Sequence, residues 1–291
     1  MIIITDQRCI EYRSVGHPEK PARVQRTVEL LRDQKALDLQ WSEPLPVEDS
    51  VLLRAHTPEH LRRLGHAEDF DGDTPFFPGI GDHARRGVGG ALQAMELARQ
   101  GQPAFSLLRP PGHHATRDRA MGFCYLSSLA AAALQARAEG VSRIGLFDFD
   151  VHHGNGTEDI VAGVDGIHFA SVHQHPCYPG TGGSDVGGNC FNHPVAPGTP
   201  RATWRSTLER ALERVLATRP QILGVSAGFD AYERDPLASG SLLREDFHWL
   251  GERLRATGIP VFSILEGGYS LDLPDLVLHY LLGLSGKSAG R

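Results

Sequence analysis

Short apolar runs alternate with amphipathic stretches along most of this sequence. The apolar runs predict β-strands at residues 1–4, 104–108, 143–149, 167–172, 221–226 and 260–265. The amphipathic stretches predict helices at about residues 20–34, 83–99, 125–138, 201–217, 243–256 and 271–284. Strands that alternate with helices are typical of βαβ units, whose strands run parallel. We therefore expect an α/β fold in which helices flank a parallel sheet on both faces.

The length of the chain limits the number of domains. Its 291 residues, 41% of them hydrophobic, can bury a large core, and α/β folds of this size commonly form one domain. We expect residues 1–291 to form a single domain. Residues 66–81 and 176–200 are rich in glycine and proline and are expected to be long loops. Loops of that length often carry function.

Composition argues against several classes of partner. The formal net charge is −6 and no polybasic run is present, so we expect no binding to nucleic acid. The four cysteines form no CxxC pair, which favours a reducing cytoplasm over an oxidising compartment. The apolar start at residues 1–4 is too short to span a membrane. The sequence predicts a cytoplasmic protein without a membrane partner.

A run of metal-binding residue types ends the predicted strand at 143–149. It reads Asp148-Phe149-Asp150-Val151-His152-His153-Gly154-Asn155-Gly156. Alternation along a strand would put Asp148, Asp150 and His152 on one face. Carboxylates buried beside an imidazole need a cation or several hydrogen-bond donors to offset the cost of burial. A divalent metal is the simplest compensation.

Polar residues also follow the other predicted strands, and ligands bind beyond the carboxyl ends of strands in open α/β sheets. These residues are His113, His114, His173, His175, Asp230, Glu266 and Tyr269. Each has an ordinary explanation: paired histidines occur in solvated turns, an aspartate can cap a helix, and Gly-Gly-Tyr can be a turn. Their convergence from five strand ends on one edge favours a functional site.

Six motifs resemble those of a known family. They are Pro110-Pro111-Gly112-His113-His114-Ala115, Gly122-Phe123-Cys124, the run from Asp148 to Gly156, Tyr178-Pro179-Gly180-Thr181-Gly182, Ala227-Gly228-Phe229-Asp230 and Glu266-Gly267-Gly268-Tyr269. In this order they are similar to the histone deacetylase superfamily, which includes bacterial deacetylase-like amidohydrolases and acetylpolyamine amidohydrolases. Asn155 together with Glu266 resembles the class II branch. The resemblance implies the arginase–deacetylase fold and one catalytic zinc.

The same resemblance implies the ligands and the catalytic groups. Asp150, His152 and Asp230 would bind zinc, and three protein ligands with an open position are typical of a catalytic zinc. Iron could occupy the same ligands. The implied catalytic residues are His114 as general base, His113 as its electrostatic aid, Asp148 and Asn155 as their partners, and Tyr269 as a donor to the oxyanion.

Further residues are implied at the substrate channel. The substrate-binding set is Gly122, Phe123, Tyr178, Asp73, Leu237 and Gly268. Phe123 and Tyr178 would form aromatic walls around an alkyl stem, and Asp73 would hold the substrate at the rim. Leu237 stands where the polyamine-selective branch carries a glutamate, which favours acyl-lysine over acetylpolyamine.

A monovalent cation and a product path also follow from the resemblance. Potassium or sodium would lie beneath the zinc, bound by Asp148, Asp150, His152, Ser171 and Val172. Arg23 would line an exit for acetate, although an arginine on a helix is more often solvated.

The sequence thus predicts a zinc-dependent deacylase that hydrolyses acyl-lysine in a protein or peptide and releases acetate or another short acid. The first alternative is an amidohydrolase for acetylpolyamine or another small acylated amine. An arginase-like hydrolase would need a second metal and additional paired aspartates. A module that binds acylated ligands without turnover is disfavoured by His113, His114 and Tyr269. The oligomeric state is not predicted.

Overall fold

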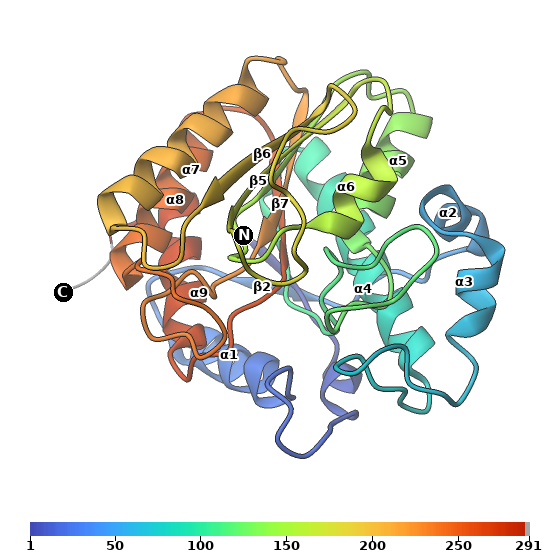
Figure 1. Ribbon diagram of the computed structural model, residues 1–291. Coiled ribbons are helices and arrows are strands. Elements are labelled where there is room, and N and C mark those ends of the chain that lie inside the picture. Colours follow the sequence, from blue (N-terminus) through green and yellow to red (C-terminus); the bar gives the residue numbers. More distant parts are fainter. Residues whose placement is uncertain (289–291) are drawn as a thin grey trace.

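Eight parallel strands form one sheet in the computed structural model, which describes residues 1–288 (Figure 1). The strands are β1 (Ile2–Ile4), β2 (Gln40–Ser42), β3 (Ala104–Ser106), β4 (Ile144–Asp148), β5 (Ile167–Gln174), β6 (Cys190–Val195), β7 (Ile222–Ala227) and β8 (Val261–Leu265). Their order across the sheet is β2-β1-β3-β8-β7-β4-β5-β6, and every neighbouring pair is parallel. The predicted parallel α/β sheet is confirmed.

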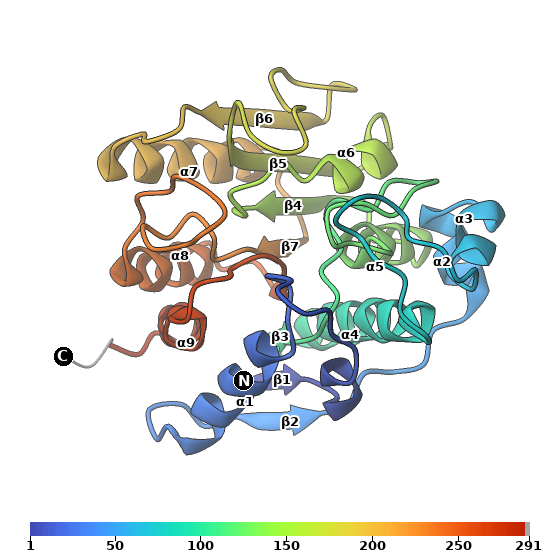
Figure 2. The same ribbon diagram turned by 60° about the horizontal axis from the view of Figure 1, so that its bottom comes forward.

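Helices cover both faces of this sheet (Figure 2). They are α1 (Ala22–Asp33), α2 (Asp49–Ala55), α3 (Pro58–Arg63), α4 (Ile80–Arg99), α5 (Ser128–Ala138), α6 (Asn155–Val161), α7 (Arg201–Leu216), α8 (Arg244–Ala256) and α9 (Leu273–Leu284). Helices α1, α7, α8 and α9 lie on one face, and α4, α5 and α6 on the other, with α2 packed outside α5. Within residues 1–288, none of the helices has both the length and the apolar character that a membrane span requires.

The centre of the sheet is apolar on both faces, as expected for strands covered by helices on each side. All residues of β4 and β7 are buried. Helix α5 is rich in alanine, and these small side chains let it pack closely beside α4 on the same face of the sheet. In α4, a Cβ atom at Gly90 would lie 2.5 Å from Leu108 Cδ1, so the absence of a side chain allows the helix to approach the strands closely.

Several short elements were not expected from the sequence. The segment 176–200 was expected to be a loop, but it contains β6, which reads Cys-Phe-Asn-His-Pro-Val. This strand forms an edge of the sheet, where proline is tolerated because one side needs no ladder hydrogen bond. The other unexpected elements are β2, α2, α3, α6 and a 3₁₀ turn at Gln7–Ile10. They are short, so periodicity gives them little signal.

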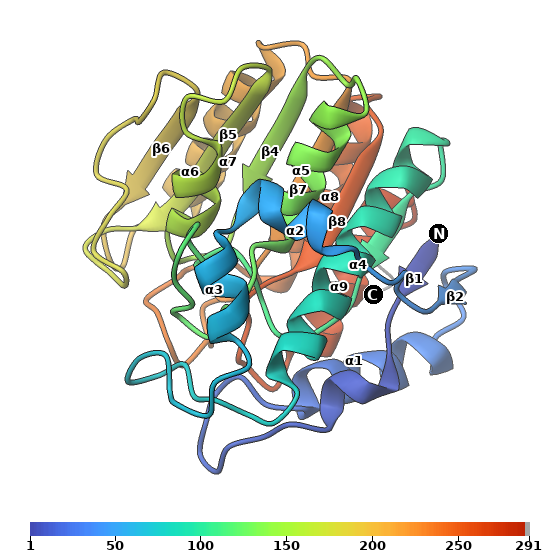
Figure 3. The same cartoon turned by 90° about the vertical axis from the view of Figure 1, so that its right-hand side faces the viewer.

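The carboxyl ends of β3, β4, β5, β7 and β8 open onto the same edge of the sheet. Parallel pairing of neighbouring strands brings about this alignment. The long connections that follow these strands gather at this edge, and Figure 3 shows them beneath the sheet. The predicted site residues lie in these connections.

Candidate active site

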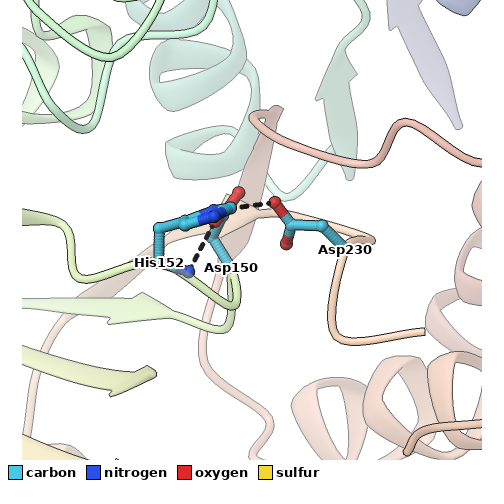
Figure 4. A group of neighbouring side chains, drawn as sticks. All are labelled: Asp150, His152 and Asp230. Carbon is cyan, nitrogen blue, oxygen red and sulfur yellow. Dashed lines mark hydrogen bonds and ion pairs between the residues drawn. The ribbon is translucent and has the colours of Figure 1, made fainter. Parts of the chain in front are cut away.

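Asp150, His152 and Asp230 meet at this edge and are buried (Figure 4). One ligand atom from each residue lies within 4.8 Å of the others. His152 Nδ1 is 3.2 Å from Asp150 Oδ1 and 3.2 Å from Asp230 Oδ2. The structure therefore brings together the three residues that the sequence analysis assigned to zinc.

The chain reaches this arrangement by bending, because β4 ends at Asp148 and the expected strand alternation stops there. The Asp150 N–H donates to Asp148 Oδ1 at 3.0 Å, and the His152 N–H donates to Asp150 Oδ1 at 2.9 Å. Each aspartate thus binds the backbone two residues ahead of it, as in an Asx turn. These two contacts replace the hydrogen bonds of a strand, and they leave Asp148 Oδ2 near His113 and Asp150 Oδ2 near Gly228.

Two glycines let the backbone approach the carboxylates. A Cβ atom at Gly228 would lie 2.1 Å from Asp150 Oδ2, and one at Gly267 would lie 2.1 Å from Asp230 Oδ2. The Gly267 N–H donates to Asp150 Oδ2 at 2.7 Å, and the Val151 N–H donates to Asp230 Oδ1 at 2.8 Å. Backbone N–H groups therefore hold both carboxylates, while Asp150 Oδ1 and Asp230 Oδ2 face the His152 ring.

The charges in this cluster fit a divalent metal. Burial and the neighbouring charge of Asp150 raise the pKa of Asp230. Burial alone would lower the pKa of His152, but hydrogen bonds to both aspartates raise it well above its usual value. Two buried carboxylates therefore need a positive partner, and two oxygens with one imidazole form a donor set that suits zinc. The residues present fit the metal that the family resemblance implies.

His113 and His114 lie beside this cluster and differ in charge. His113 Nδ1 is 3.1 Å from Asp148 Oδ2, and His113 Nε2 is 3.7 Å from Asp150 Oδ1. Burial opposes the charged form, but Asp150 and Asp148 raise the pKa of His113 to about 10. Burial and the charge of His113 lower the pKa of His114 well below its usual value. The pair therefore holds one imidazolium and one neutral imidazole.

Asn155 selects the tautomer of His114. Its Oδ1 lies 2.7 Å from His114 Nδ1 and is the acceptor, so Nδ1 carries the hydrogen. The lone pair of His114 is then on Nε2, which is the form that can take a proton. This contact places Asn155, the first residue of α6, next to the histidine that the sequence analysis named as the base.

Glu266 supports the turn that carries the two histidines. Its Oε2 accepts hydrogen bonds from the Gly112 N–H at 2.7 Å and the His113 N–H at 3.1 Å. Burial raises the pKa of Glu266 to about 7. The sequence analysis placed Glu266 at the shared edge and used it to indicate the class II branch, but it missed this supporting contact. A carboxylate directly after a buried strand was the available signal.

Tyr269 lies against a buried arginine. The Arg23 guanidinium carbon is 4.7 Å from the centre of the tyrosine ring, and Arg23 Nε donates to the carbonyl oxygen of Gly268 at 2.7 Å. Arg23 also donates to the carbonyl oxygen of Glu266. Only 4% of Arg23 is exposed, so the alternative of a solvated helix arginine is wrong.

A buried ion-pair network continues behind Arg23, and the sequence analysis missed it. Glu19 Oε1 lies 3.3 Å from Arg23 Nη1, and Glu19 Oε2 accepts from Arg109 Nη2 at 2.7 Å. Arg109 is fully buried and also donates to the carbonyl oxygen of Cys9 at 2.6 Å. Glu19 and Arg109 are 90 residues apart in the sequence, so no local pattern indicates that they pair.

Aromatic side chains surround the approach to these groups. The ring centres of Tyr178 and His114 are 5.1 Å apart, and those of Phe123 and Tyr269 are 5.8 Å apart. Gly122 has a φ of 56°, and a Cβ atom there would lie 2.6 Å from His114 Cδ2 and 2.8 Å from Tyr178 Cε1. Glycine is therefore needed where the walls meet. Phe123 and Tyr178, which the sequence analysis assigned to the channel walls, thus lie beside Tyr269 and His114.

Asp73 lies near Phe123 through His17, and Leu237 lies on the segment that follows Asp230. The backbone carbonyl of Asp73 is 3.0 Å from His17 Nε2, and the His17 ring lies 4.6 Å from the Phe123 ring. Burial, and next the neighbouring Asp71, raise the pKa of the Asp73 carboxyl. Leu237 is 36% exposed, and its N–H donates to Asp235 Oδ1 at 3.0 Å.

The residues assigned to a monovalent cation are close neighbours. Asp148 of β4 is paired in register with Ser171 of β5, and Val172 follows it. All three are buried.

His173, by contrast, does not join the metal cluster, because its Nε2 lies 3.0 Å from the Gly182 carbonyl oxygen. The strand β5 also runs two residues further than expected and includes His173.

Comparisons with known proteins agree with this geometry. The family model described as "Histone deacetylase domain" matches residues 17–283. The chain is 37% identical to a histone deacetylase-like amidohydrolase of Pseudomonas aeruginosa over 88% of this chain and 73% of that protein.

Two solved structures are similar over nearly the whole chain. The HDA15 HD domain has a TM-score of 0.92 at 28% identity and covers 99% of this chain and 91% of its own. An acetylpolyamine aminohydrolase from Burkholderia pseudomallei has a TM-score of 0.87 at 26% identity, with coverage of 98% and 99%.

Proposed function

The chain belongs to the histone deacetylase family and has its arginase–deacetylase fold, and from this premise we propose that it is a zinc-dependent deacylase of acyl-lysine. One observation carries the proposal: three buried metal-ligand side chains, a charged histidine, a neutral histidine and a tyrosine share one strand edge. Hydrolysis of an unactivated amide needs these functions together.

Asp150, His152 and Asp230 would hold the zinc. When bound, zinc polarises a carbonyl and lowers the pKa of water. His114 accepts the proton of the attacking water at Nε2, because Asn155 keeps the hydrogen on Nδ1. The same nitrogen then returns the proton to the amine that leaves.

The neighbouring groups stabilise the charge that develops. His113 remains an imidazolium between Asp148 and Asp150, so it supplies a fixed positive charge beside His114. The Tyr269 hydroxyl donates to the oxygen of the tetrahedral intermediate, and burial raises its pKa well above the usual value, so it stays protonated. Arg23 packs on the Tyr269 ring and binds the carbonyl beside it, which supports the donor.

The mouth of the site favours acyl-lysine. Phe123 and Tyr178 provide apolar walls for an alkyl stem and exclude water from it. Leu237 is apolar and cannot pair with a secondary ammonium group. Hydrolysis of a small acylated amine is the second candidate, because a similar solved structure is named an acetylpolyamine aminohydrolase.

Potassium or sodium would be held beneath the zinc by Asp148, Asp150, His152, Ser171 and Val172.

We test this function with a matched pair of substrates on zinc-replete protein. An acetyl-lysine peptide should be hydrolysed with a higher kcat/KM than acetylspermidine. Tyr269→Phe removes only the donor hydroxyl and should lower kcat by about 10²- to 10³-fold, the usual cost of losing one oxyanion donor.

The same assay separates the alternatives. A preference for acetylspermidine would favour the small-amine reaction. Two metals per chain would favour an arginase-like hydrolase. Binding of several acyl peptides without any turnover would instead indicate a recognition module.

Asn155→Asp should shift the pH dependence of kcat/KM. An aspartate at 2.7 Å would stabilise the imidazolium of His114 and raise its pKa. The base works only when neutral, so activity is lost below its pKa, and the acidic limb should move to higher pH. Profiles of wild type and variant measured from pH 5 to 9 provide the comparison. Superimposable profiles would contradict the assigned contact.

A further inference from the structure

Asp235 makes contacts that the proposed mechanism does not use. It is 6% exposed, and its Oδ2 accepts hydrogen bonds from the Tyr269 N–H at 2.7 Å and the Ser270 N–H at 3.1 Å. Its Oδ1 accepts from the Leu237 N–H at 3.0 Å. One buried carboxylate therefore joins the backbone of the oxyanion donor to the backbone of a mouth residue.

The segment that carries Asp235 is itself well held. Tyr232 forms a bridge with Leu242 at its base, and a Cβ atom at Gly240 would lie 2.1 Å from the Ala231 carbonyl oxygen. The Ser239 N–H donates to Gln174 Oε1 at 2.9 Å, which ties the far side of the segment to the end of β5. The segment that carries Asp235 is therefore held by contacts on both sides.

Asp272 also joins the two segments. Arg234 Nη2 lies 2.9 Å from Asp272 Oδ2, with the two side chains 65% and 33% exposed, and the Tyr232 hydroxyl donates to the same oxygen at 3.2 Å. Exposed ion pairs contribute little, whereas a buried carboxylate that accepts several backbone N–H groups is a strong contact. Of these contacts, that of Asp235 is the one made to the backbone of Tyr269 itself.

We propose that Asp235 is a positioning residue that sets the place of the Tyr269 hydroxyl and couples it to the mouth at Leu237. The inference rests on the proposed function for Tyr269. The side chain of Tyr269 begins at the residue whose N–H Asp235 binds, so a shift of this backbone moves the hydroxyl. A misplacement of about 1 Å at a catalytic donor can cost about 10²-fold in rate.

Asp235→Asn is the test, because it keeps the shape of the side chain. The amide has one accepting oxygen, and its NH₂ group would face either the Leu237 N–H or the N–H groups of Tyr269 and Ser270. We expect kcat on the acetyl-lysine peptide to fall about 10- to 100-fold, with a smaller change in KM. In a Tyr269→Phe background the same substitution should cost less than about threefold, since the donor is already absent.

Hydrogen exchange gives a readout that does not depend on activity. The Tyr269 and Ser270 amides should exchange at least about tenfold faster in Asp235→Asn than in wild type. Arg234→Gln removes the exposed tie alone and should change neither exchange nor kcat. If Asp235→Asn does not fold, Asp235→Glu displaces the carboxylate by one methylene and supports the same comparisons.

The outcomes are distinct. An equal loss of kcat in both backgrounds, or unchanged amide exchange, would overturn the inference even if the enzyme is a deacylase. Faster exchange in a protein that hydrolyses no amide would overturn the proposed function and leave the positioning contact supported.

Discussion

Asp230→Asn is expected to abolish both metal binding and turnover. The substitution keeps the size of the side chain, and its carbonyl oxygen can still accept from the Val151 N–H. It removes a negative charge from a set of only three ligand side chains. The metal supplies several kcal/mol of transition-state stabilisation, so kcat/KM should fall by at least about 10³-fold. Metal analysis of purified protein and the peptide assay measure the two effects.

Thermal unfolding gives a second measure of metal binding. A ligand at about 100 times its Kd stabilises a folded protein by about 2.7 kcal/mol. Zinc should therefore raise the Tm of metal-free wild type and leave the Tm of metal-free Asp230→Asn unchanged. Retention of one zinc per chain with full activity would contradict the ligand assignment.

Asp246→Asn is the matched control. Asp246 is also fully buried, but it pairs with Arg201 at 2.6 Å and caps α8 through the Leu243 N–H at 2.7 Å. Its loss should lower the Tm without lowering the metal content. The comparison separates the loss of a metal ligand from the loss of a buried carboxylate.

The sheet was well predicted because its strands carry a strong pattern. The runs at β4 and β7 are apolar except near their carboxyl ends and are buried on both faces, and each was located to within a residue or two. The edge strands β2 and β6 were missed, since β2 has three residues and β6 contains a proline. Their pairing depends on neighbours that are distant in the sequence.

The sequence indicated the residue types of the site, but it did not indicate the contacts that hold these residues in place. Asp150 and His152 stood in one short run, and their residue types already indicated a metal. The contacts of Asp235 with Tyr269 and of Glu266 with His113 are long-range bonds from side chain to backbone. Such bonds produce no periodic pattern in a sequence. The burial of Arg23 likewise depends on Glu19 and on the carbonyl groups after β8.

His114→Ala should lower kcat by about 10²- to 10⁴-fold, which is the usual contribution of a positioned general acid and base. The prediction depends on the different protonation of His113 and His114. His113 is held as an imidazolium by two carboxylates, so it has no lone pair to offer. His114 is buried and neutral, and its Nδ1 hydrogen is bound by Asn155. In the proposed mechanism the proton therefore moves through Nε2 of His114.

Three measurements check that assignment. Zinc content should stay at one per chain, because His114 is not a ligand. The acidic limb of the kcat/KM profile, which reports protonation of the base, should disappear. Added imidazole should restore part of the activity, since the substitution leaves space for it. His168→Ala is the control: His168 lies near the start of β5, at the opposite end of the sheet, and should leave kcat unchanged.

The result also distinguishes the two histidines from each other. If His113→Ala lowered kcat more than His114→Ala and removed the acidic limb, the proton-carrying role would belong to His113. That outcome would require His113 to be neutral in the working enzyme. Its two carboxylate neighbours at 3.1 and 3.7 Å argue against this, because each stabilises the charged ring.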